Sequence, residues 1–532
     1  MKKKQTFFVL AAALLLSVLA SCKGADETPS DTVVESDTVI ALNAYNIVES
    51  SHDALVASGL MYGTWQSIAI TDDLDAFISE YHNQDTASQL TPQALQAIMG
   101  PSEMLIFDDE SVVMLFNTET RSSGSAFWIS SSGSFTENEI VITYEINSTS
   151  HSYSHFLVSI EDSVLMFLQY AGLNGQLANT NAKYVILEKT SNSAHWMIEE
   201  YDEFRYADIH IADLSDFGES ILTLNFSEHT VFPPISKMPD DDTLQPYYII
   251  EAGKNPGLGV RALHERGITG KGVSVAIIDQ ALSLNHPEYS DSIKEYYDFV
   301  GGTYSMHGPA VVSILAGRSI GVAPDVDVYY FNISGNTEDG RRDATQYAQA
   351  IDMIIEMNEG LPNNEKIRLV SYSAGFSIDN ISQINADLYL ESVARAAAAG
   401  ILILDCSPEL CFIAYSGYAY DSPEDVALCR PGPLSGFIAP SEYFNDHIFA
   451  PVHYRTVAEV TYAGVPMYSY WGQGALSFAV PYVSGVLALG WEVRPELSPE
   501  EILAVLFDTA YVDNEGYKHI YPAAFIDALL AG

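Results

Sequence analysis

The 532-residue chain is poor in basic residues, with 24 lysines and arginines against 70 aspartates and glutamates and a formal net charge of −46. Such a surface repels nucleic-acid phosphates, so we expect no nucleic-acid partner. The sequence also lacks paired metal-binding motifs and the spacing of a calcium loop. We therefore expect no cofactor and no metal; a structural calcium ion would suit the acidity, but no motif supports one.

Cysteine is scarce as well, with four residues in the whole chain. Three of them, Cys406, Cys411 and Cys429, lie close together in the sequence. An odd number allows at most one disulfide among them and leaves one thiol over, and the pairing stays open. We expect a buried, structural role for at least one.

The N-terminus has a long apolar run, from Phe7 to Leu19, preceded by three lysines and too short to span a bilayer comfortably. It ends in Leu19-Ala20-Ser21-Cys22, which resembles the lipobox of bacterial lipoproteins. The resemblance implies a signal peptide over residues 1–21 and acylation of Cys22, hence an extracytoplasmic protein anchored in a bacterial membrane. Lys23 after the cysteine is compatible with the outer membrane. Ordinary signal cleavage beside a chance cysteine is the alternative.

The remaining length exceeds what one core organises, and 48% apolar residues suffice for several cores. Residues 22–54 are polar and predict a flexible tether. Short apolar runs separated by turn residues predict a β-rich domain over 55–190. Its Gly63-Thr64-Trp65 resembles small lipocalin-like barrels; a propeptide of inhibitory or folding-assisting kind is the alternative. Residues 191–250 predict a connector that packs on a C-terminal domain over 251–532.

The C-terminal domain opens with a predicted helix over 260–267 and a buried strand over 273–278, after which Asp279 follows directly. Strands this apolar and β-branched are typical of parallel sheets, whose carboxyl ends collect active-site residues. His307 begins a run of small and apolar residues that predicts a buried helix starting at the histidine. Ser477 begins a second such helix, in which Pro481 is tolerated near the start.

The segments around Asp279, His307 and Ser477 resemble the three motifs of the subtilisin family, peptidase family S8, in the same chain order. The resemblance implies a doubly wound α/β domain with a mostly parallel sheet. It also implies a serine endopeptidase acting on peptide or protein substrates through an acyl-enzyme. Ser477 would be the nucleophile, His307 the base, and Asp279 the residue that orients the imidazole.

The resemblance is incomplete at the oxyanion hole, because the family's asparagine is missing after the strand-like run at 400–404. The backbone N–H of Ser477 is one candidate donor, and Ser407 or a backbone amide in its loop is a second. The segment Ser373-Ala374-Gly375 resembles the family's substrate-lining segment, so we expect the substrate backbone along it. Losing one oxyanion donor typically slows turnover by about 100- to 1000-fold.

Two other functions remain open. A catalytically weak or silent subtilase-like protein that binds peptides would fit the altered histidine and serine motifs and the missing asparagine. Alternatively, the β-rich domain could be the functional part and bind a small apolar ligand. Cleavage specificity, the fate of the N-terminal domain and the oligomeric state do not follow from the sequence.

Overall fold

The computed structural model describes the strand residues between 63 and 191, residues 71–73, 77, 183, 198 and 200, and residues 202–532 except 206–208, 211, 302–304, 334–336, 338–340, 409, 435–437 and 462–463. The predicted signal peptide, Cys22 and the predicted tether lie outside the described residues.

The N-terminal part forms an antiparallel sheet of nine strands in the order β3-β2-β1-β9-β7-β6-β5-β4, with β8 paired to β7. Its core contains Trp65, Phe167 and Ile186, each fully buried. The prediction of an antiparallel β-rich domain is confirmed in this coarse sense, whereas the lipocalin-like interpretation stays a prediction. The strands are β1 (Gly63–Thr71), β2 (Glu103–Ile106), β3 (Val112–Leu115), β4 (Gly133–Thr136), β5 (Glu139–Tyr144), β6 (Thr149–Ile160), β7 (Ser163–Leu173), β8 (Gln176–Leu177) and β9 (Tyr184–Ser191).

The C-terminal part is organised by a parallel five-stranded sheet in the order β12-β13-β11-β15-β17. The chain builds β13 on one side of β11 and then crosses to build β15 on the other, which makes the end of β11 a switch point of the sheet. This parallel sheet confirms the predicted α/β class. The strands are β11 (Ser274–Asp279), β12 (Ile293–Asp298), β13 (Asp327–Asn332), β15 (Ile367–Ser371) and β17 (Leu402–Leu404).

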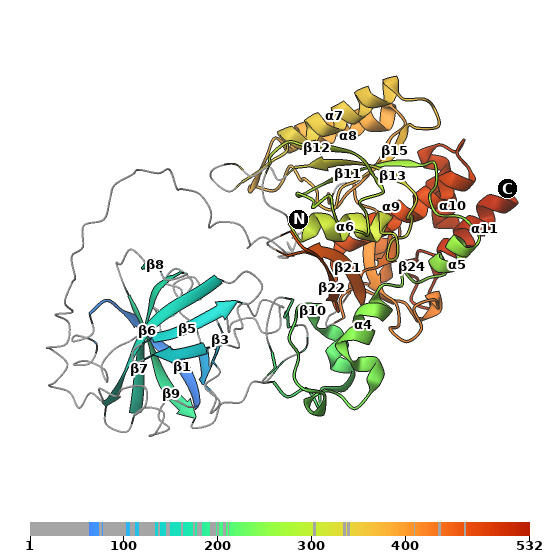
Figure 1. Cartoon of the computed structure of the whole chain (residues 1–532). Coiled ribbons are helices and arrows are strands. Elements are labelled where there is room, and N and C mark those ends of the chain that lie inside the picture. Colours follow the sequence, from blue (N-terminus) through green and yellow to red (C-terminus); the bar gives the residue numbers. More distant parts are fainter. Residues whose placement is uncertain are drawn as a thin grey trace, which may run out of the picture. The chain divides into compact units, whose positions relative to one another are not determined.

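Helices cover both faces of this sheet, because alternate side chains of a strand point to opposite faces. Val275 and Ile277 of β11 belong to the core shared with α6 and α9, whereas Ala276 and Ile278 belong to the core shared with α7 and α8. Figure 1 shows α7 and α8 together on one side of the sheet, and α6 and α9 on the other. The helices are α4 (Pro246–Gly253), α5 (Val260–Glu265), α6 (His307–Ala316), α7 (Thr345–Gly360), α8 (Ala386–Ala398), α9 (Leu476–Val493), α10 (Pro499–Asp508) and α11 (Pro522–Ala531).

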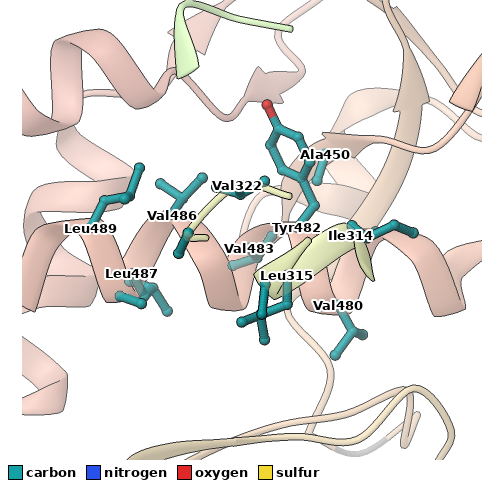
Figure 2. Packing of buried hydrophobic residues seen from close by; sticks show 14 of the residues in the cluster. Ile314, Leu315, Val322, Ala450, Val480, Tyr482, Val483, Val486, Leu487 and Leu489 are labelled. Atoms are coloured by element: carbon teal, nitrogen blue, oxygen red, sulfur yellow. The ribbon is translucent and has the colours of Figure 1, made fainter. Parts of the chain in front are cut away.

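Helix α9 is the central helix of the larger core. Its side chains Val480, Tyr482 and Val483 pack with Ile314 and Leu315 of α6 in Figure 2. A side chain at Gly485 would place its Cβ 2.6 Å from Val322, so only glycine allows this close approach. By length and composition α9 could cross a membrane, but 78% of it is buried inside the fold, as expected for a core helix.

Three further sheets, of three, two and five strands, belong to the described residues of the C-terminal part. The connector supplies β10 (Asn225–Ser227) to an antiparallel sheet with β21 (Arg455–Val460) and β22 (Pro466–Trp471). The residues preceding and following β10 include Phe204, Ile221 and Ile249, which form a buried cluster with Tyr470 of β22. The other strands are β14 (Arg342–Asp343), β16 (Gln383–Ile384), β18 (Ile413–Gly417), β19 (Arg430–Pro431), β20 (Ile448–Pro451), β23 (Tyr511–Val512) and β24 (Lys518–His519), and short 3₁₀ helices span Gly218–Thr223, Ile235–Lys237, Asp242–Leu244, Val426–Leu428 and Ser441–Phe444.

Candidate active site

Asp279 is the last residue of β11, whose six residues are all buried. The carboxylate is 5% exposed. Its Oδ1 accepts a hydrogen bond of 2.8 Å from the backbone N–H of Gln280, and the same oxygen accepts one from His307. The strand therefore holds the carboxylate at the switch point of the sheet and fixes the direction in which it points.

His307 is the first residue of α6, as the sequence predicted. Its backbone N–H donates to the hydroxyl of Ser305 over 3.0 Å, which satisfies one donor of the first turn. The next residue, Gly308, lies so close to the end of β11 that an added Cβ would be 2.4 Å from the carbonyl oxygen of Gln280. The absence of a side chain at Gly308 therefore lets the start of α6 reach Asp279.

Asp279 and His307 form a hydrogen-bonded pair, with 2.8 Å between Oδ1 and Nδ1. Because an ionised carboxylate only accepts, Nδ1 carries the hydrogen and Nε2 is left with a lone pair. Burial acts to lower the pKa of His307, but the charge and the hydrogen bond of Asp279 oppose it and the net pKa is raised. The imidazole side chain is 25% exposed, so it is accessible on one side.

Ser477 lies in the first turn of α9, and its side chain is partly exposed. Helix geometry offers no carbonyl partner for N–H groups of the first turn, and their partial positive charge faces the residues at the helix start. Within the described part of the chain, the Ser477 hydroxyl makes no hydrogen bond. Helix α9 packs against α6, which begins at His307.

Two glycines in the turn before Ser477 are tightly enclosed. A Cβ on Gly472 would be 2.4 Å from the carbonyl oxygen of Leu222 in the connector, and one on Gly474 would be 2.2 Å from that of Val452. The N–H of Gly472 donates to Leu224 O over 3.1 Å. The connector and the residues after β20 thus hold this turn from two sides.

His453 is a buried residue that also holds this turn, and it is 0% exposed. Its Nε2 donates to the carbonyl of Gly432 over 2.8 Å, and its Nδ1 accepts from the N–H of Gly474 over 3.3 Å. Burial lowers the pKa of His453 to about 4, partly opposed by the bond to Gly432. The imidazole is therefore neutral at physiological pH, which the acceptor role of Nδ1 requires.

A buried ion pair also joins the connector to β21. Arg205 Nη1 lies 2.7 Å from Glu459 Oε1 in β21, and the side chains are 10% and 0% exposed. The guanidinium also lies 4.6 Å from the centroid of the Trp471 ring. A buried charge pair of this kind needs both partners in place.

The structure overturns the expectation that Ser407 donates to an oxyanion. Its hydroxyl donates to Asp405 Oδ2 over 2.5 Å, and its N–H donates to Asp405 Oδ1 over 3.2 Å. The hydroxyl also accepts from the N–H of Phe376 over 3.0 Å, and the residue is 0% exposed. Both donors are used inside the fold, so Ser407 has none left for a substrate.

The predicted substrate-lining segment Ser373-Ala374-Gly375 follows β15, at the same edge of the sheet as Asp279. Its carbonyl groups already have partners: Ala374 O accepts from Cys406 N over 2.8 Å, and Gly375 O accepts from the side chain of Gln383 over 3.2 Å. A substrate backbone would therefore find few free acceptors here. The expectation of substrate binding along this segment stays a prediction.

The clustered cysteines Cys406, Cys411 and Cys429 are all free thiols. Cys429 is 3% exposed, and burial raises its pKa to about 12, which suits a structural role. The sequence did not single out His453 or Arg342 as candidate functional residues. Neither residue belongs to a motif, and each acquires its neighbours only through folding.

Residues 270–407 match the Subtilase family, peptidase S8, a span that includes Asp279 and His307 and ends before Ser477. The chain is 25% identical over 307 residues to the subtilisin of Bacillus sp. strain TA39, covering 50% of this chain and 69% of that protein. It is 26% identical over 280 residues to subtilisin BL of Lederbergia lenta, covering 50% of this chain and 93% of that protein.

The subtilisin-like protease PopC of Myxococcus xanthus is 25% identical over 284 residues, which are 47% of this chain but only 58% of PopC. Among solved structures, fervidolysin from Fervidobacterium pennivorans is similar with a TM-score of 0.40 at 17% identity, covering 55% of this chain and 48% of that one. Residues 270–407 are thus similar to the Subtilase family, and the chain has subtilisin-like relatives at 25–26% identity.

Proposed function

We propose that this chain, which carries a subtilase domain, is a serine endopeptidase anchored by lipid on the extracytoplasmic side of a bacterial membrane. Support for peptidase activity comes from the family match and from relatives that are named as proteases. The geometric observation that carries the proposal is the 2.8 Å bond between Asp279 and His307 at the switch point of the sheet.

In the proposed reaction the Ser477 hydroxyl attacks the substrate carbonyl while Nε2 of His307 takes its proton. Asp279 keeps the hydrogen on Nδ1, which leaves Nε2 as the base and stabilises the imidazolium that forms. His307 then returns the proton to the leaving amine, and water hydrolyses the acyl-enzyme by the same steps in reverse order. The raised pKa of His307 fits the growing positive charge on its ring.

The proposed oxyanion donor is the N–H of Ser477, in the first turn of α9. The helix dipole adds to its effect, because the partial positive charge of the helix start faces the developing negative charge. Because the donors of Ser407 are used inside the fold, we identify one oxyanion donor where a complete oxyanion hole would have two. A missing donor costs about 10²- to 10³-fold in turnover, so we expect a slow enzyme rather than an inactive one.

The test is covalent labelling with a fluorophosphonate, a reagent for activated serines, combined with hydrolysis of peptide substrates. Wild type should be labelled once per chain, and Ser477→Ala should abolish labelling and lower hydrolysis by at least about 10³-fold. Ser484→Ala is the matched control: this serine lies in the same helix, is 0% exposed, and bonds only to Val480 O within α9. Its replacement should leave labelling intact.

The outcomes separate the proposal from a silent, peptide-binding protein. Wild-type protein that binds peptides but takes no label and cleaves none would reject the peptidase and favour peptide capture. The relatives, which are named as proteases, do not favour that alternative.

The proposed lipid anchor depends on Cys22 and on the lipobox-like residues before it. Cells fed an alkyne-tagged fatty acid should incorporate it into the wild-type chain and not into Cys22→Ser, while Cys411→Ser serves as the control cysteine. The wild-type chain should sediment with outer membranes. Incorporation that persists in Cys22→Ser would reject Cys22 as the acylated residue.

A further inference from the structure

Arg342 occupies a distinctive place at the carboxyl edge of the parallel sheet, in the short strand β14. Its guanidinium donates to the hydroxyl of Tyr372 and, over 3.4 Å, to the carbonyl oxygen of Gly375. Aromatic rings surround it: Cζ lies 5.0 Å from the ring centroid of Phe376, 5.5 Å from that of Tyr347 and 5.7 Å from that of Tyr372. The rings hold the guanidinium by packing and cation–π attraction.

No carboxylate forms an ion pair with Arg342 among the residues that the structure describes. The adjacent Asp343 is used elsewhere, because its Oδ1 accepts from the N–H of Thr345 over 2.9 Å and from Asn385 over 2.9 Å. Arg205 and Arg395, by contrast, each contact a carboxylate at 2.8 Å or less. A largely buried cation thus lies without an ion-pair partner among the described residues, in a chain with a net charge of −46.

This cation lies beside the candidate catalytic pair. Tyr372 and Gly375, two of its hydrogen-bond acceptors, directly follow β15, which pairs in parallel with β11 and hence ends beside Asp279. The electrostatic coupling agrees with this placement: the charge of Arg342 acts to lower the pKa of His307. A substrate bound at His307 therefore lies within the field of Arg342.

We propose that Arg342 is a specificity-determining residue that selects peptides with a carboxylate side chain near the bond to be cut. A guanidinium has five N–H donors in a planar fork that matches a carboxylate, and the hydrogen bonds of Arg342 to Tyr372, Gly375 and Tyr347 engage only part of that fork. The rings already restrict its rotamers, so binding loses little side-chain entropy. Because the acidic surface repels carboxylates elsewhere, we expect the preference at one substrate position only.

This inference rests on the proposed peptidase activity. It is tested with the full-length protein in detergent and a set of quenched fluorescent peptides that are neutral except for one aspartate, placed at each position in turn. Each peptide has an asparagine twin of nearly the same shape. At one position, the kcat/KM of the aspartate peptide should exceed that of its twin by about 10- to 100-fold, as for a charge-assisted hydrogen bond.

Variants identify the residue responsible. In Arg342→Gln, the ratio of kcat/KM for the aspartate peptide to that for its asparagine twin should fall close to one at that position. This holds even if the variant cleaves both peptides more slowly than wild type. Arg342→Lys, which keeps the charge without the fork, should retain part of the preference. The matched control is Arg341→Gln, which removes the same charge from the neighbouring, exposed residue and should leave the wild-type ratio unchanged.

The results distinguish this inference from the proposed function. Cleavage of neutral peptides that Ser477→Ala abolishes, without a preferred aspartate at any position, would overturn the role of Arg342 and leave the peptidase standing. A preference that survives in Arg342→Gln would also overturn it. Failure to cleave any peptide would reject the peptidase itself and, with it, this inference.

Discussion

Replacing Arg205 by methionine tests whether the connector is an integral part of the catalytic unit. The ion pair between Arg205 and Glu459 spans 254 residues in sequence, and Glu459 is fully buried. Methionine keeps a long side chain at this position but removes the charge and the contact of the guanidinium with Trp471. Glu459 keeps its hydrogen bond from Ser469 but loses the ion pair with Arg205.

The size of the effect follows from burial. Breaking a buried pair by removing one partner typically costs 3–5 kcal/mol, because the remaining charge stays in a medium of low dielectric constant, and we expect about that loss here. For units of this size, each kcal/mol shifts the unfolding midpoint by about 2–4 °C. Arg205→Met should therefore lower the midpoint of the catalytic unit by roughly 6–20 °C.

The matched control is Arg395→Met, which breaks an exposed pair with Asp352 whose two contacts are both 2.8 Å and whose side chains are each 48% exposed. Both variants remove one positive charge that contacts carboxylates, which are Glu459 and Glu203 for Arg205 and Asp352 for Arg395. Water and salt screen the exposed pair, so its loss should barely move the midpoint. Differential scanning calorimetry of both variants at neutral pH is the assay. Equal shifts would refute the reasoning that burial decides the cost.

The other predictions concern the active site and pH. Because the pKa of His307 is raised, kcat/KM should fall on acidification through a pKa above 6.5. Asp279→Asn should move this acidic limb of the pH profile to lower pH and reduce kcat by about 10⁴-fold. A pH profile of peptide hydrolysis measures both effects. Between pH 6.5 and about 4 the unfolded state protonates His453 while the fold does not, so acidification should cost up to about 3 kcal/mol of stability. Denaturant melts across this window should show a shallower pH dependence in His453→Gln, and an unchanged slope would contradict the assignment. Gly308→Ala should abolish fluorophosphonate labelling, since its Cβ would clash with a backbone carbonyl, and full labelling would show that α6 can shift.

Local patterns account for the elements that the sequence predicted correctly. The apolar, β-branched run before Asp279 could only be a buried strand, and the structure has it as β11 with every residue buried. The small residues after His307 likewise predicted a helix beginning at the histidine, which α6 confirms. Such features depend on neighbours within a few residues, so they are visible without the fold.

Contacts between distant segments could not be predicted in the same way. Nothing near Ser407 in the sequence indicated that the N–H of Phe376, 31 residues earlier, would donate to its hydroxyl. The roles of His453 at the turn before Ser477 and of Arg205 against Glu459 depend on pairings across tens to hundreds of residues. A side chain's type says what it can bond to, whereas its partners are chosen by packing.

The sequence by itself therefore determined the α/β class, the order of the three motifs and the ends of the elements that carry them, because secondary structure and chemical type are written in short stretches of residues. Only the tertiary structure decided that Gly308 admits α6 close enough for His307 to bond Asp279, that Ser407 is buried with its donors used, and that Arg342 meets no carboxylate among the described residues. Those outcomes depend on distances between segments, which close packing sets.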